Sequence, residues 1–145
     1  MTGPVTRTGW LLACGNLDRR DDGAALRATA GLPAVACGHL DIDDLLGAPA
    51  GRPIVICDAA AGVPAGQVMT LSFDELLANP SGPSPHSSHA LPIDQVIGVA
   101  RALSDAPIDG VFVGIGGTDF GYGEGLSATV EAALPGFRAA IEAAA

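Results

Sequence analysis

The chain has 145 residues, of which 48% are hydrophobic and 16% are charged, so residues 1–145 are predicted to form one folded domain. Its formal net charge is −9 and it has no basic stripe or polybasic segment, which argues against nucleic acid or a membrane surface as partner. The cysteine count is three, with no Cys-x-x-Cys pair, so a disulfide framework is not expected.

Residues 1–8 contain one arginine and no long apolar stretch, and no apolar run of ~18 residues follows, so a cytoplasmic location is expected.

In the first half of the chain, short apolar runs alternate with helical patterns. The strands are expected at 10–14, 33–37 and 53–57, and the helical segments at 21–30 and 42–46. The run at 53–57 is the clearest, because it is β-branched, apolar and without alternation, as in a strand covered on both faces.

The second half continues this alternation. A strand is expected at 67–73, a loop at 78–88, a helix at 93–103, a strand at 111–115 and a glycine-rich loop at 116–125. Ser127 is predicted to open a last helix over 128–143, interrupted at Pro135-Gly136. Strands that alternate with helices predict an α/β fold: a three-layer sandwich with a twisted, mostly parallel sheet and helices on both faces.

Three residues stand where such a sheet holds its ligands, beyond the carboxyl ends of the strands. Asp22 follows the first strand, Asp58 ends the third, and His89 follows a long loop and leads into a helix. If the runs at 10–14 and 53–57 are neighbours in the sheet, Asp22 and Asp58 face one crevice. Two carboxylates and an imidazole suit a divalent metal ion of borderline hardness and leave coordination positions open.

Other interpretations of these residues stay open. Asp22 also fits a helix cap, and His89 an ordinary exposed residue at a helix start. Asp58 is harder to explain structurally, because a carboxylate after an apolar strand is costly to bury unless it is paired or bound to metal.

Further polar or reactive residues lie nearby. His39 is expected at the surface, and Cys14, Cys37 and Cys57 are expected to pack in the core. The charged cluster Asp18–Asp21 fits either a solvated turn or a contact with a substrate.

Four segments, in order, resemble the hydrogenase maturation endopeptidases. The segments are Gly15-Asn16-Leu17 with Asp21-Asp22-Gly23, then Ile54 to Ala59, then Ser87 to Leu91, and finally Val113-Gly114-Ile115 with Gly125-Leu126-Ser127. The resemblance runs from about Gly15 to Pro135. The sequence differs from the family pattern at Cys37–Asp41 and at Gly116–Asp119.

The resemblance implies an enzyme that removes a C-terminal extension from the precursor of a nickel–iron hydrogenase large subunit. It places Asp22, Asp58 and His89 on the family's acidic and histidine positions, as both catalytic residues and ligands of nickel. On this reading the nickel arrives with the substrate, and no organic cofactor is needed.

The proposed reaction is peptide hydrolysis without a covalent intermediate, because no Ser-His-Asp or Cys-His arrangement is evident. A metal ion could polarise the scissile carbonyl or activate water, or a carboxylate with a raised pKa could act as base. Two rival functions remain: a non-catalytic metal-sensing or chaperone module for the same precursor, and a different hydrolase on a similar sheet. A nucleotide-binding role is disfavoured, since neither GxGxxG nor a P-loop motif occurs.

Overall fold

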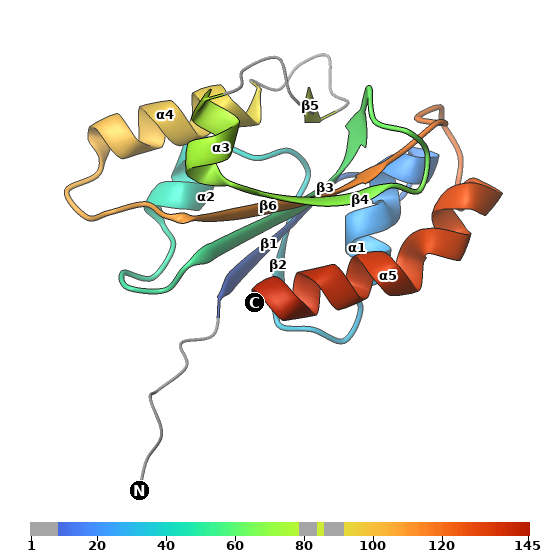
Figure 1. The fold of residues 1–145 in the computed structure, drawn as a ribbon, viewed down its shortest axis with the longest axis horizontal. Helices are drawn as coiled ribbons and strands as arrows, with labels where there is room; N and C mark the ends of the chain where they lie inside the picture. The colour runs from blue at the N-terminus through green and yellow to red at the C-terminus, as the bar shows by residue number, and fades with distance from the viewer. Residues whose placement is uncertain (1–8, 79–83, 86–91) are drawn as a thin grey trace, which may run out of the picture.

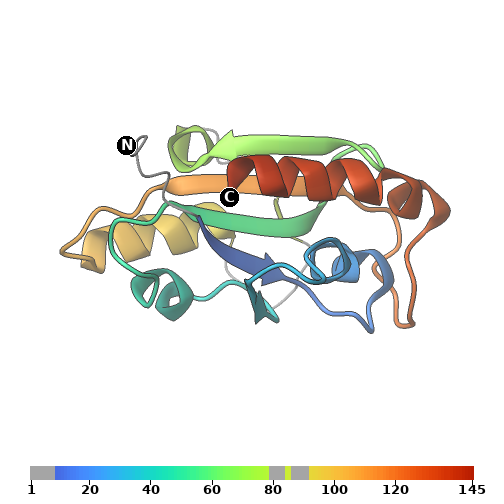
Figure 2. The ribbon, with the colours of Figure 1, turned by 90° about the horizontal axis from the view of Figure 1, so that it is seen from below.

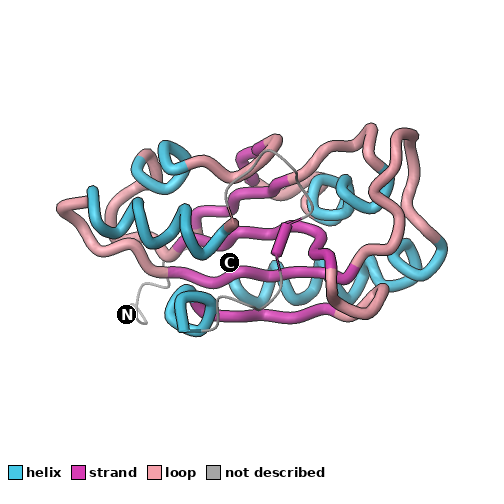
Figure 3. The backbone as a smooth tube through the Cα atoms, turned by 90° about the horizontal axis from the view of Figure 1, so that it is seen from above, coloured by secondary structure: helices cyan, strands magenta, loops and turns pink. Residues whose placement is uncertain are grey.

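A twisted β-sheet forms the middle layer of the molecule in the computed structural model, which describes residues 9–78, 84–85 and 92–145 (Figure 1). Within this part of the chain the strands form one six-stranded sheet in the order β2-β1-β3-β6-β4, with β5 paired to β3. The strands are β1 (Trp10–Cys14), β2 (Ala34–Cys37), β3 (Ile54–Ala61), β4 (Val68–Ser72), β5 (Ser84–Pro85) and β6 (Gly110–Gly116). Figure 3 shows the strands side by side between the helices.

The centre of the sheet is parallel. Strand β1 pairs in parallel with β2 and β3, and β3 pairs in parallel with β6, whereas β4 runs antiparallel to β6 and β5 antiparallel to β3. The parallel strands are apolar on both faces because helices cover both of them. The fold predicted from the sequence, a mostly parallel sheet with helices on both sides, is therefore confirmed.

Helices cover the two faces in separate groups (Figures 1 and 2). They are the 3-10 helix η1 (Arg20–Gly23) and the α-helices α1 (Ala24–Ala28), α2 (Ile42–Leu46), α3 (Phe73–Ala78), α4 (Ile93–Leu103) and α5 (Ala128–Ala144). The apolar residues of α2, α3 and α4 pack in one core cluster with Leu12 and Ile56. Those of α1 and α5 pack in a second cluster with Leu11 and Val55, on the other face. No helix in the described ranges has the length and apolar character needed to cross a membrane.

Several predicted elements match closely and others do not. The helices at 42–46 and 93–103 are confirmed residue for residue. The helix predicted over 21–30 is instead η1 followed by the short α1, and α3 was not predicted. The third strand is longer than predicted, so Asp58 lies inside β3 and does not end it. The loop predicted over 78–88 lies mostly outside the described residues.

The last helix is continuous, and the interruption predicted at Pro135 is wrong. Proline cannot donate to the carbonyl of Glu131, which costs about 3 kcal/mol in a helix interior. Burial of Val130, Phe137 and Ile141 on either side of Pro135 supplies the compensating free energy, since all three are fully buried against the sheet. Packing of α5 on the sheet thus overrides its local sequence preference.

We predict that Phe137→Ala lowers the free energy of unfolding by about 3–5 kcal/mol, because it opens a cavity in a fully buried position under α5. Leu103→Ala is the matched control: the Leu103 side chain is 65% exposed, and its loss is expected to change stability by no more than about 0.5 kcal/mol. Urea denaturation of both variants measures the difference. Equal effects would show that α5 does not hold the core.

Candidate active site

Asp22 and Asp58 approach each other across Gly15. Because β1 pairs in parallel with β3, with Ala13 opposite Cys57, the end of β1 lies beside Asp58. A Cβ atom built on Gly15 would lie 1.8 Å from the carbonyl oxygen of Asp22 and 3.6 Å from Oδ1 of Asp58. Gly15 also has a φ of 131°, so only glycine fits this close approach. The strand pairing therefore brings two of the three predicted site residues to one place.

The carboxyl group of Asp58 is held in an environment that opposes its ionisation. Asp58 is 5% exposed, and it lies between β1 and β6 in the centre of the sheet. Burial, and then the negative charge of Asp22, raise the pKa of Asp58 well above its usual range, while a hydrogen bond from the backbone N–H of Ala59 to Oδ1 opposes them. A carboxyl group with a raised pKa can exchange protons at a pH nearer neutrality, as acid–base catalysis requires.

Asp22 closes the loop that follows β1. The backbone N–H of Asn16 donates to Oδ2 of Asp22 at 3.0 Å and to its carbonyl oxygen at 3.3 Å. Asp22 does not cap α1, because the N-cap position belongs to Gly23 and has no side-chain cap hydrogen bond. The capping interpretation of Asp22 is therefore wrong, and its carboxylate belongs to the loop around Gly15.

Asp21, next to Asp22, anchors a second loop. Its side chain is fully buried and accepts hydrogen bonds from the backbone N–H groups of Thr118, Asp119 and Ser127, at 2.9, 3.0 and 2.7 Å. The hydroxyl of Ser127 donates to it as well, at 2.9 Å. Burial pushes the pKa of Asp21 up, but these hydrogen bonds outweigh it and hold the pKa below its usual value. Asp21 therefore ties the loop between β6 and α5 to the candidate site.

This anchoring role of Asp21 was not predicted from the sequence. Both interpretations of the charged cluster Asp18–Asp21, a solvated turn and a substrate contact, fail for the buried Asp21. The adjacent arginines also bind the neighbouring loop: Arg19 Nε donates to the carbonyl of Phe120 at 3.0 Å, and Arg20 forms an ion pair with Asp119 at 3.3 Å. The groups that donate to Asp21 lie about 100 residues away in the sequence, so no local spacing pattern could reveal this contact.

His89 lies outside the described residues, so its predicted place beside the carboxylates stays a prediction. The structure does fix both flanks: Pro85 pairs with Ala60 of β3, and Pro92 is the N-cap of α4. His39 is exposed, as expected. No group of three metal-ligating side chains is found among the described residues.

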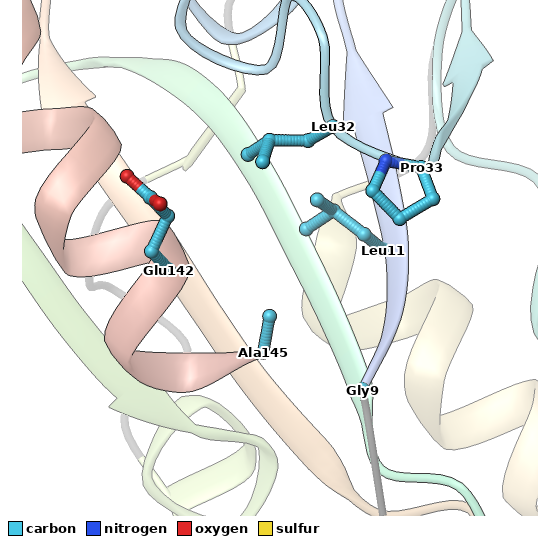
Figure 4. A pocket seen from close by; sticks show the side chains of 6 residues that line it. All are labelled: Gly9, Leu11, Leu32, Pro33, Glu142 and Ala145. Atoms are coloured by element: carbon cyan, nitrogen blue, oxygen red, sulfur yellow. The ribbon is translucent and has the colours of Figure 1, made fainter.

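A separate hollow of about 250 Å³ lies near the start of β1 (Figure 4). Its lining residues are Gly9, Leu11, Leu32, Pro33, Glu142 and Ala145. It is mostly apolar and is built at the end of β1 away from Gly15, so it shares no residue with the candidate site.

Comparison with solved structures finds proteins that share this fold along nearly the whole chain. One is a [NiFe] hydrogenase maturation protease, HybD from Thermococcus kodakarensis, with 26% identity over 95% of this chain and 99% of the other, and a TM-score of 0.73. Another is the hydrogenase maturating endopeptidase HybD from E. coli, with 24% identity, 94% and 91% coverage and a TM-score of 0.74. No family model matches the chain. No curated protein matches it either.

These neighbours bear out the resemblance read from the sequence. The chain shares the fold of solved proteins that are named as hydrogenase maturation proteases and endopeptidases.

We predict that Asp58→Asn makes the protein more stable at pH 7 in the absence of added metal. In the wild type the folded pKa of Asp58 is raised, so its stabilising contribution is complete below the unfolded pKa of about 3.9 and is lost as the pH rises through the folded pKa. Asparagine does not ionise, so the variant avoids this loss of stability, which is about 1.4 kcal/mol for each unit by which the folded pKa exceeds the unfolded pKa. Thermal unfolding at pH 7 measures the gain.

The exposed Asp105 in the loop after α4 provides the control, because Asp105→Asn changes the same chemical group without burial. A melting temperature for Asp58→Asn at or below that of the wild type would contradict the predicted cost of burying this carboxylate.

We predict that Asp21→Asn lowers the free energy of unfolding by roughly 1–3 kcal/mol at pH 7, because an amide N–H₂ would face backbone donors. The lowered pKa means that the ionised Asp21 stabilises the fold above about pH 3.9 and loses that effect as the pH falls through its folded pKa. Urea denaturation at pH 7 and at about pH 3 should therefore show a difference between wild type and variant that shrinks in acid. A difference independent of pH would contradict the role given to the charge.

Proposed function

We propose that this chain is an endopeptidase that removes the C-terminal extension of a nickel-loaded hydrogenase large-subunit precursor. The observation that carries the proposal is the approach of Asp22 and Asp58 around Gly15 in the maturation-protease fold. The site is built where parallel sheets bind ligands, beyond the end of β1.

Asp22, Asp58 and His89 are the residues proposed to contact the nickel. In this proposal the nickel is a recognition handle that belongs to the substrate and is not a resident cofactor. Two carboxylates and one imidazole fit a borderline divalent ion and leave positions for the ligands that the precursor supplies. Of the described residues on either side of His89, Pro85 pairs with Ala60 of β3, and α4 packs on the same face of the sheet as Ile56.

The proposed chemistry is hydrolysis by an activated water, as in an aspartic-type endopeptidase. Asp22 and Asp58 interact electrostatically, and like charges at close range keep one carboxyl group protonated while the other is ionised. The ionised group can take a proton from water, and the protonated group can donate one to the scissile carbonyl. When the tetrahedral intermediate collapses, the C–N bond breaks and the proton taken from water passes to the leaving amine. Nickel held by the substrate would add charge that favours the same transition state.

Two further parts of the proposal come from the sequence alone. A cytoplasmic location and the lack of an organic cofactor stay predictions. The rival functions, a chaperone that holds the precursor and a hydrolase with another substrate, use the same fold and the same carboxylates. Turnover on the precursor distinguishes all three.

We predict that incubation with the nickel-loaded precursor from the same organism releases a C-terminal peptide, and that the nickel-free precursor is not cut. Asp22→Ala, Asp58→Ala and His89→Ala are each expected to abolish release, because each removes one contact to the metal. Intact mass spectrometry of the precursor measures the cleavage. His39→Ala is the matched control for His89→Ala, since His39 is an exposed histidine that should leave processing unchanged.

The outcomes separate the rival functions. Binding of the nickel-loaded precursor without any change of mass would favour the chaperone. Absence of both binding and cleavage would favour the unrelated hydrolase. Cleavage that survives all three alanine substitutions would contradict the assigned site.

A further inference from the structure

Two cysteines lie side by side next to the candidate site. Cys14 ends β1 and Cys37 ends β2, and they are direct partners in the parallel register of these strands. Both are free thiols, both are buried, and both lie in the core cluster on the same face of the sheet. The pair therefore forms a dithiol at the carboxyl ends of β1 and β2, close to Gly15 and Asp58.

The third cysteine is not part of this pair. Cys14 and Cys37 belong to the core cluster on the face covered by α2, α3 and α4. Cys57 belongs to the cluster on the opposite face, and its thiol donates to the carbonyl of Leu12 at 3.4 Å. The sheet itself separates Cys57 from the other two, so the structure holds one dithiol and one separate thiol.

Parallel strands place register partners about 4.7–4.9 Å apart, which lies inside the range of about 4.4–6.8 Å between the Cα atoms of disulfides. We infer that Cys14 and Cys37 are an oxidative modification site, at which a low-molecular-weight disulfide closes a reversible disulfide bond between β1 and β2. The bond would join strands that are already paired.

Cys37 is the entry point for this reaction. It is 7% exposed whereas Cys14 is fully buried, and it ends β2, the strand at the edge of the sheet. The next residue, Gly38, is exposed and has open space where a Cβ atom would lie. Local opening at the end of an edge strand therefore uncovers Cys37 first.

The reaction is an exchange in two steps. The Cys37 sulfur attacks one sulfur of the small disulfide, and the other half leaves as a thiolate that takes up the Cys37 proton. The Cys14 sulfur then attacks the Cys37 sulfur and displaces the second half, which leaves with the Cys14 proton. Two protein thiols are oxidised to one disulfide, and the small disulfide is reduced to two thiols.

The modification would act on the candidate site through Cys14. Cys14 directly precedes Gly15, around which Asp22 and Asp58 converge, and its thiol interacts electrostatically with Asp58. A bond to Cys37 removes that thiol proton and covalently fixes the end of β1, next to Gly15, to β2. Loss of precursor processing on oxidation, restored by dithiothreitol, is expected; this part rests on the proposed function, whereas formation of the bond does not.

The experiment treats the folded wild-type protein with oxidised glutathione, blocks the remaining thiols and maps the peptides under non-reducing conditions. The oxidised protein should be lighter by two hydrogen atoms before blocking, and the map should then show a Cys14–Cys37 disulfide and a blocked Cys57. Cys57→Ala is the matched control: it removes an equally buried cysteine on the other face and should form the same bond. Cys37→Ala should leave Cys14 unmodified, because Cys14 has no access of its own.

Several results would overturn the inference. They are a mixed disulfide that stops at Cys37, a bond that involves Cys57, and three thiols that stay free while the protein is folded. Peptide mapping tests formation of the disulfide even if the wild-type protein never cuts the precursor. If the wild-type protein does cut the precursor, unchanged processing by the disulfide form would overturn only the claim that the disulfide regulates processing.

Discussion

The parallel pairing of β1 with β3 is the constraint on which the candidate site depends. Parallel neighbours end at the same edge, so the turn after β1 must pass beside whatever side chain β3 presents there. That side chain is the carboxyl group of Asp58, and the turn passes it at Gly15. Because β3 is also paired with β6, Asp58 cannot move away to water. The sheet therefore fixes the position of the carboxyl group and raises its pKa.

Asp21 and Asp22 show how neighbouring identical residues can have different roles. Asp22 faces Gly15 and the loop at Asn16, near Asp58. Asp21 faces the other way and holds the loop at Thr118 and Asp119. Arg20, just before the two aspartates, has a φ of 48°, in the left-handed region. One short segment thereby connects the candidate site to both β1 and β6.

Much of the architecture could be predicted from the sequence, and so could the approach of Asp22 and Asp58. Apolar runs without alternation identify covered strands, and helical spacing identified α4 without error. The failures have a common cause, since each depends on contacts with segments distant in sequence. Asp58 looks like the end of a strand until β6 pairs beyond it, and Pro135 looks like a helix end until α5 packs on the sheet. The anchoring role of Asp21 exists only once the β6–α5 loop lies next to it.

The same reasoning explains where this chain differs from the family pattern. In the stretch Gly116–Asp119, the backbone N–H groups of Thr118 and Asp119 donate to Asp21. Because these contacts use backbone atoms, they do not require particular side chains at these two positions. In Cys37–Asp41, Asp41 and Asp44 form a reciprocal capping box at the start of α2. Both differences therefore have structural roles of their own. Neither removes a carboxylate from the candidate site, and neither changes Gly15, beside which the backbone carbonyl of Asp22 and the carboxyl group of Asp58 lie. The two departures therefore lie in the loops around the candidate site and not at Asp22 or Asp58.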